Sequence, residues 1–346
     1  MDHTDNILRE MIAVAEPLCR DAAKQLARSG PGRKPVIPDW FLALMIMIAI
    51  SKGKKSKAAQ LHFWSYHHLL LEPFCEGWGF PSRSTFYDRY RRIWEIFEIA
   101  IELHTKKAIR YRWIDPEVVS VDKSVIPARG KRPKKRRRKQ KRVDHEATWT
   151  PNEYHGWTYG YSYEVVLSST KKTLNWPMIA SAATASRSES RTLGEKLPRL
   201  APQVKYVLAD RGYDADDHCE ATEWKGDVRL ERRFVYPLRR SSRGPAQKEH
   251  KRSKQRKLRQ EHRRLRKQFV DSVRGKSLYA LRGTTIEPFN SWFKQLFDLH
   301  DRVWHRGVAN NKTQILGAVF LNQVLLRINL KHNRRNGQIK WLLDSL

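Results

Sequence analysis

The sequence Val118-Val-Ser-Val-Asp122 is a β-branched run that ends in an acid, and Val204-Lys-Tyr-Val-Leu-Ala-Asp210 repeats this arrangement later in the chain. Short apolar runs of this kind are typical of buried strands. A carboxylate that closes such a strand lies at the carboxyl edge of the sheet, where open α/β sheets hold their sites. We therefore predict that Asp122 and Asp210 end two strands and face a common site.

Strands and helices alternate throughout the region that contains these two acids, from about residue 113 onward. Residues 161–168 alternate between apolar and polar side chains, which predicts a half-buried strand. The closing stretch, 310–330, predicts an amphipathic helix. The remaining expected elements are strands at 175–183 and 234–238 and helices at 188–200 and 285–299.

The first 112 residues instead have the pattern of an all-α region. Residues 40–50 are apolar on all sides, which predicts a buried core helix with Asp39 as its N-cap. A second helix is expected at 58–71. After a break at 76–81 that contains glycine and proline, Ser82 begins another helical stretch.

This Ser82 helix is a candidate recognition helix of a helix-turn-helix. Its apolar stripe contains Phe86 and Tyr90 and leaves Arg83 and Arg89 outside, where they would face a DNA major groove. Most amphipathic helices are only packing units, so the alternative is a structural helix with arginines on its solvent face.

The charge of the chain indicates a polyanionic partner. Its 346 residues include 68 Lys and Arg against 36 Asp and Glu, for a formal net charge of +32. The cations gather in blocks, in a basic loop at 129–148 and a basic insertion at 239–278. Phosphate contacts are expected in the loop from Lys134, Lys135, Arg136, Arg137 and Arg138. The alternative for this loop is a charged segment without defined contacts.

Other sequence features narrow the class of protein. The three cysteines lie far apart without a paired motif, which argues against a disulfide framework or a zinc knuckle. We find no signal peptide, no apolar run long enough to span a bilayer and no phosphate-binding loop for nucleotides. These features predict a soluble cytoplasmic protein, associated with the nucleoid, without membrane contact.

A third acid, Glu287, lies near the start of the expected helix at 285–299. Together with Asp122 and Asp210 it would place three carboxylates on three rigid elements. Phosphodiester cleavage by two metal ions requires such oxygen ligands, which select Mg²⁺ or Mn²⁺. Considered singly, an aspartate at a strand end is more often a turn or capping residue than a metal ligand.

Four blocks of sequence, in this order, resemble those of bacterial insertion-sequence DDE transposases, most closely the insertion sequence four/five group. They cover about residues 113–330 and read Val121-Asp-Lys-Ser, Gly156-Trp-Thr-Tyr-Gly-Tyr-Ser-Tyr, Ala209-Asp-Arg-Gly-Tyr-Asp and Ile286-Glu-Pro-Phe-Asn-Ser-Trp-Phe-Lys. The resemblance implies an RNase H-like catalytic domain over 113–332, with a mixed sheet flanked by helices, after the helical DNA-binding region 1–112.

The resemblance also implies roles for single residues. Asp122, Asp210 and Glu287 would be catalytic metal ligands for Mg²⁺, in two ions, with Mn²⁺ as a substitute. Lys294, seven residues after Glu287, matches the lysine of the family motif, and Arg282 matches its arginine; both would contact DNA phosphates. Arg282 lies five residues before Glu287, where the common pattern has four.

The function expected from this resemblance is cleavage of double-stranded DNA at terminal inverted repeats and joining of the 3′-hydroxyl ends to target DNA. A homodimer on DNA is expected, because two ends must be brought together. Two alternatives stay open: an RNase H-like nuclease without strand transfer, and a decayed or domesticated transposase that only binds DNA.

Overall fold

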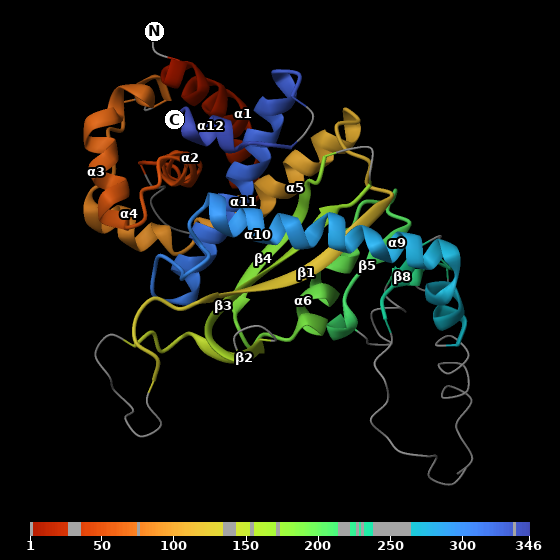
Figure 1. Ribbon diagram of the computed structural model, residues 1–346. Coiled ribbons are helices and arrows are strands. Elements are labelled where there is room, and N and C mark those ends of the chain that lie inside the picture. Colours follow the sequence, from red (N-terminus) through yellow and green to blue (C-terminus); the bar gives the residue numbers. More distant parts are fainter. Residues whose placement is uncertain are drawn as a thin grey trace.

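A helical region and a sheet flanked by helices make up the computed structural model of the chain (Figure 1). The predicted contacts Lys134, Lys135, Arg136, Arg137 and Arg138, and residues 239–263 of the basic insertion, lie outside the described residues. Those that the structure describes are 3–26, 36–74, 77–133, 143–152, 156–170, 174–213, 222–225, 228–229, 232–237, 264–334 and 337–346.

The helical region contains five α-helices and two short 3₁₀ turns among its described residues. They are α1 (His3–Gln25), α2 (Asp39–Ser51), α3 (Lys57–His67), η1 (His68–Leu70), η2 (Glu72–Phe74), α4 (Arg83–Tyr90) and α5 (Trp94–Arg110). Helix α2 is buried along its whole length after Asp39, which confirms the predicted core helix. Its N-cap is Pro38 rather than Asp39, which is the first helical residue.

The candidate recognition helix is α4. The Ser82 hydroxyl accepts a hydrogen bond from the Thr85 backbone N–H at 3.3 Å, so the predicted serine cap is confirmed. Arg89, however, is only 8% exposed, and its Nε donates to Asp39 Oδ1 at 2.8 Å. Arg89 therefore joins α4 to α2 and does not lie on the solvent face where the sequence placed it; its contact with DNA stays a prediction. Arg83 is exposed.

The main sheet has the strand order β4-β3-β1-β5-β8, with β2 beside the first half of β3. Strand β3 pairs antiparallel with β1 and β4, whereas β1, β5 and β8 are mutually parallel neighbours. This mixed sheet is the one that the sequence predicts. The strands are β1 (Val118–Pro127), β2 (Thr148–Asn152), β3 (Gly156–Ser168), β4 (Pro177–Thr184), β5 (Tyr206–Leu208) and β8 (Arg233–Val235); a separate hairpin pairs β6 (Trp224–Lys225) with β7 (Val228–Arg229).

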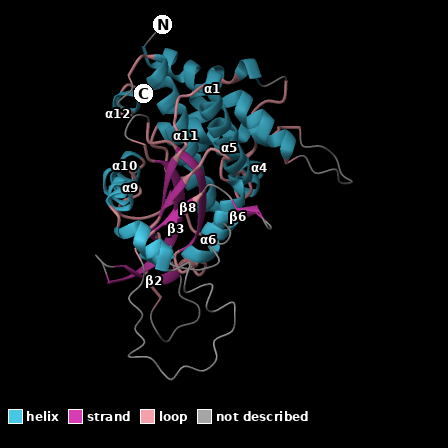
Figure 2. Ribbon diagram, turned by 90° about the vertical axis from the view of Figure 1, so that its right-hand side faces the viewer, coloured by secondary structure: helices cyan, strands magenta, loops and turns pink. Residues whose placement is uncertain are grey.

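Helices cover both faces of the sheet (Figures 1 and 2). On one face, Asp122 and Tyr163 meet α10 (Ile286–Leu296), which follows α9 (Val273–Thr284). On the other face, Lys123 and Glu164 meet α6 (Glu189–Lys196), which continues into η3 (Leu197–Arg199). Because both faces are covered, β3 is buried from residue 158 to 168, and the expected half-buried strand is wrong.

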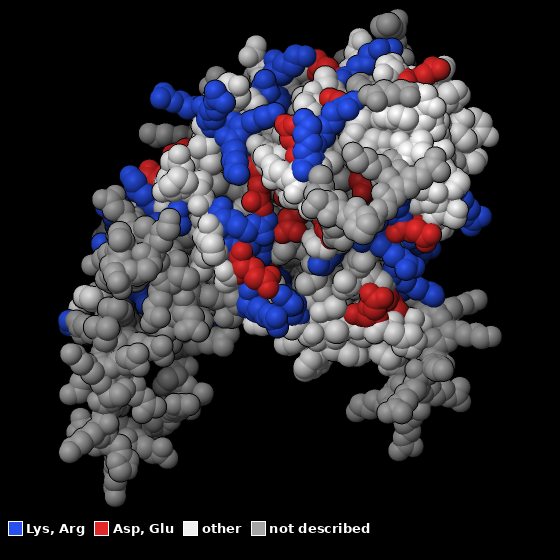
Figure 3. All heavy atoms as spheres, turned by 180° about the vertical axis from the view of Figure 1, so that it is seen from behind, with Lys and Arg blue, Asp and Glu red and all other residues white. Residues whose placement is uncertain are grey.

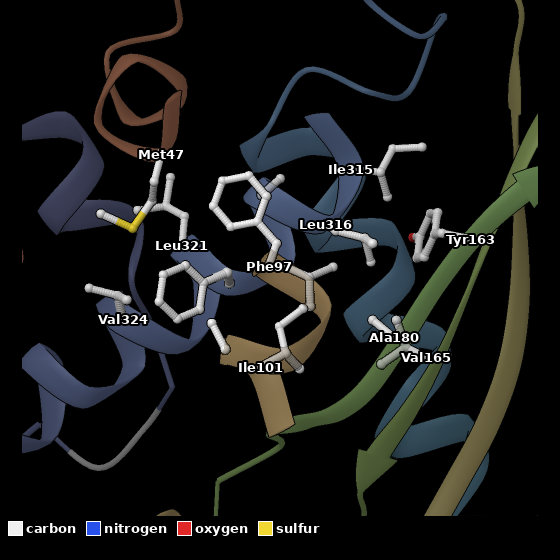
Figure 4. Close-up of a cluster of buried hydrophobic side chains, with 14 of the residues drawn as sticks. Met47, Phe97, Ile101, Tyr163, Val165, Ala180, Ile315, Leu316, Leu321 and Val324 are labelled. Carbon is white, nitrogen blue, oxygen red and sulfur yellow. The ribbon is translucent and has the colours of Figure 1, made fainter. Parts of the chain in front are cut away.

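Helix α11 (Val308–Lys331) joins the helical region to the sheet. Every residue from Thr313 to Leu326 is buried, so the expected amphipathic helix is wrong. Figure 4 shows side chains of α5 and α11 between Met47 of α2 and Val165 of β3. One hydrophobic core thus extends across residue 112, the predicted domain boundary. A short helix, α12 (Lys340–Asp344), ends the chain.

The surface carries the positive charge unevenly. From behind, basic side chains gather in groups with fewer acidic ones among them, while other areas carry neither (Figure 3). Among the helices that the structure describes, none is long and apolar enough to cross a membrane.

Candidate active site

Asp122 and Asp210 occupy matching positions on two neighbouring parallel strands. The last paired residues of β1 and β5 are Ser120 and Leu208, and each aspartate lies two residues further along its own strand direction. Asp210 follows the end of β5, as predicted. Asp122 does not end its strand, because β1 continues to Pro127 along β3. The sheet is nevertheless open beside Asp122, since β5 has already ended.

The Asp122 carboxylate is held by two side chains from the helices above it. Its Oδ1 lies 3.1 Å from Arg282 Nη2, and its Oδ2 accepts a hydrogen bond from Asn290 Nδ2 at 2.7 Å. Burial raises the pKa of Asp122 to about 7, with the Arg282 charge opposing and the Asp210 charge reinforcing the rise. The two aspartates are therefore close enough for their charges to interact.

Of the predicted DNA contacts, Arg282 touches the Asp122 carboxylate and Lys294 lies near enough to interact with its charge. Arg282, from the last turn of α9, is 6% exposed, and its Nη1 donates to the Tyr279 hydroxyl at 3.3 Å. Lys294 of α10 is half-buried; burial lowers its pKa, and the nearby Asp122 charge opposes this shift. The site thus has two cations near its half-buried acid.

Glu287 is placed differently from the two aspartates. It is an exposed residue in the first turn of α10, on the helix stripe that also contains Asn290 and Lys294. Within the described part of the chain, no three acidic, histidine or cysteine side chains lie close enough together to hold a metal ion. The structure therefore does not bring Glu287 to Asp122 and Asp210, and its role as the third ligand stays a prediction.

An acid that sequence reasoning missed, Glu189, lies next to Asp210. A Cβ atom added to Gly212 would collide with the Glu189 carboxylate and lie 2.8 Å from Asp210 Oδ1, so the two acids border one glycine. Glu189 Oε1 is also 3.9 Å from Lys123 Nζ. Glu189 lies at the start of α6, within the helix expected at 188–200, and no sequence motif indicated this contact.

A buried polar network fixes the turn that carries Asp210. The turn is η4 (Arg211–Tyr213), in which the Gly212 N–H donates to Asp210 Oδ1 at 2.7 Å. The Tyr213 hydroxyl donates to Glu164 Oε2 at 2.8 Å, and Lys196 Nζ donates to Glu164 Oε1 at 2.5 Å. Glu164 is 2% exposed and Lys196 is 1% exposed. The network connects the Asp210 turn to Glu164 on β3 and Lys196 on α6. The sequence predicted no role for either residue.

The family model described as a transposase DDE domain matches residues 113–322. The chain belongs to this family. Its members are DNA transposases that depend on divalent metal ions. The matched segment begins just before β1 and ends within α11, so it contains both aspartates and all of α9 and α10.

Comparison with solved structures finds the piggyBac transposase in a synaptic complex with hairpin DNA. It is 10% identical to this chain with a TM-score of 0.39, and the alignment covers 99% of this chain and 78% of the other. That degree of likeness carries no argument about function. No curated protein matches the chain.

The residues at the site fit a divalent cation in their chemistry. Asp122 and Asp210 provide hard carboxylate oxygens, and the buried Asn290 Oδ1 has no hydrogen-bond partner among the described residues. Two carboxylates whose charges repel, one of them with a raised pKa, are stabilised by a cation between them. Arg282 supplies part of that positive charge in the structure.

Proposed function

We propose that this protein is the transposase of a bacterial insertion sequence of the four/five group. It would cut DNA at the terminal inverted repeats of its element and join the 3′-hydroxyl ends to target DNA. The observation that supports this most strongly is the matched position of Asp122 and Asp210 on parallel strands, with Arg282 and Lys294 beside them.

In this proposal Asp122 and Asp210 are the metal ligands, and Glu287 supplies the third carboxylate from α10. When bound, two Mg²⁺ ions, replaceable by Mn²⁺, would supply an activated nucleophile and charge stabilisation at the departing oxygen. The buried Glu164 network would hold the Asp210 turn in place. Glu287 is exposed in the first turn of α10, and its side chain would turn toward the aspartates when DNA is bound.

Positive side chains would bind the DNA backbone. Lys294 and Arg282 lie beside Asp122, so a phosphate brought to that carboxylate would meet both cations. Arg83 on α4 and the basic loop 129–148 would add contacts further out. We expect a homodimer on double-stranded DNA, in the nucleoid of the cytoplasm, because transposition requires two element ends together.

The test supplies the protein with labelled DNA ends of its own element and a supercoiled target plasmid in Mg²⁺. One set of ends has a 3′-hydroxyl and a matched set has a 3′-dideoxy terminus. A transposase joins the first set to the plasmid and leaves the second unjoined. Cleavage of the DNA without any joining would identify a nuclease of the same fold. Binding without cleavage or joining would identify a DNA-binding protein.

A further inference from the structure

We propose that Asn290 is a further residue of the metal site and that its side-chain Oδ1 is a neutral oxygen ligand, either to the cation or to a water bound to it. This inference rests on the proposed function, because it adds a ligand to the site of Asp122 and Asp210. Neither the sequence motif nor the family comparison assigns a role to this position.

The two ends of the Asn290 amide are in different situations. Its Nδ2 donates to Asp122 Oδ2 at 2.7 Å, whereas its Oδ1 is buried without a hydrogen-bond partner among the described residues. The residue as a whole is 6% exposed. The orientation of the amide is fixed by chemistry, because the reversed amide would place its oxygen against the Asp122 carboxylate.

A buried carbonyl oxygen without a hydrogen-bond partner destabilises the fold, so its presence calls for an explanation. The backbone around it is firmly placed: the Asn290 carbonyl lies 3.5 Å from the Tyr163 hydroxyl, and Phe293 lies against the Tyr163 ring with centroids 5.2 Å apart. The side chain is thus fixed beside an acid of the candidate metal site. Amide carbonyl oxygens are ligands that suit Mg²⁺ and Mn²⁺.

The position of Asn290 on α10 agrees with this role. It lies three residues after Glu287 and four before Lys294, so all three belong to one stripe of the helix. Among these three residues, Asn290 is the one that touches Asp122 directly in the structure. One helix face would then present a carboxylate, a neutral oxygen and a cation to the same site.

The experiment is a calorimetric titration of the full-length protein with Mn²⁺ in the absence of DNA. Asn290→Leu keeps the size of the side chain but removes both polar atoms. Asn290→Asp removes the Nδ2 donor but keeps an oxygen at the Oδ1 position. Gln295→Leu removes an amide from an exposed position of the same helix and is the matched control. Circular dichroism melts verify that each variant is folded.

We expect Asn290→Leu to weaken Mn²⁺ binding by about ten- to hundredfold, while Asn290→Asp and Gln295→Leu bind at least as well as wild type. Equal binding by wild type and Asn290→Leu would overturn the proposal. A similar loss in the Leu and Asp variants would overturn it too, because Asn290 would then act only as a donor that positions Asp122. If the Leu variant does not fold, the Asp variant is compared with wild type alone, and weaker Mn²⁺ binding by the Asp variant would overturn the proposal. Wild-type protein that binds no Mn²⁺ would overturn the proposed function along with this inference.

Discussion

Replacing Lys196 by Met should destabilise the protein strongly, because it leaves the Glu164 carboxylate buried without its cation. Glu164 is 2% exposed, and its Oε1 accepts from Lys196 Nζ at 2.5 Å. Its Oε2 accepts from the Thr192 and Tyr213 hydroxyls at 2.7 and 2.8 Å, which are neutral donors. Breaking a buried ion pair from one side costs about 3 to 5 kcal/mol, and we expect Lys196→Met to lower the free energy of unfolding by that amount.

Urea unfolding of the DNA-free protein, followed by circular dichroism, measures this loss. The double variant Lys196→Met, Glu164→Gln removes both charges and should regain most of the stability. The matched control is Glu195→Gln, next to Lys196 on α6. Glu195 is 54% exposed and forms an ion pair with Arg187, which precedes the helix. This substitution should cost no more than about 1 kcal/mol. A Lys196→Met cost as small as that of the control, or a double variant less stable than Lys196→Met, would show that the Lys196–Glu164 pair does not stabilise the fold in this way.

Three further predictions concern stability. Gly160→Ala would drive a Cβ into the Ile126 carbonyl of the paired strand, so we expect a loss of about 1 to 3 kcal/mol in urea unfolding; an unchanged midpoint would contradict this. Ser82→Ala should cost about 1 kcal/mol, because the Thr85 N–H loses its cap, and a cost near zero would show that the cap contributes nothing. Without metal, Asp122 with its pKa raised to about 7 keeps its proton where the unfolded chain has lost it. The contribution of Asp122 to the free energy of unfolding is full below about pH 4 and is lost as the pH rises through 7. Asp122→Asn should lack this part of the decline in stability. Curves of stability against pH that run parallel for the two proteins would contradict the prediction.

The sequence was sufficient to predict the elements that depend on local pattern. Short apolar runs bounded by polar residues predicted the strands at Asp122 and Asp210. The same kind of pattern predicted the buried helix α2. Their adjacency could also be expected, because the family resemblance places these two acids on neighbouring strands. The resemblance also predicted the mixed sheet and the helices on its faces, and the structure confirms both.

What the sequence could not predict depends on tertiary neighbours. Helix α11 has polar residues such as Asn322 and Gln323 on an apolar background, which resembles an amphipathic helix. In the fold, Gln323 Nε2 donates to the carbonyls of Ile101 and Pro177, so the NH₂ group of this side chain is paired inside the core. Arg89 likewise looks like a surface arginine until Asp39, fifty residues earlier, is placed beside it.

The candidate site was predicted in part. The motif predicted the acids and Lys294, but the contact of Arg282 with Asp122 depends on the last turn of α9 meeting β1, which no local pattern specifies. Asn290 could have been noticed, since it lies on the same helix stripe as Glu287 and Lys294. Its importance becomes visible only when Asp122 is seen to accept its hydrogen bond.

The central claim is that Asp122 and Asp210 support metal-dependent phosphodiester chemistry. The most direct test is Mg²⁺-dependent cleavage and strand transfer on a plasmid that carries the element's own flanking repeats, comparing wild type with Asp210→Asn. Binding of both proteins to the labelled repeat is measured in parallel by gel shift. We predict that the variant binds the repeat as wild type does but neither cleaves nor joins DNA. Equal cleavage and joining by the two proteins would contradict the account.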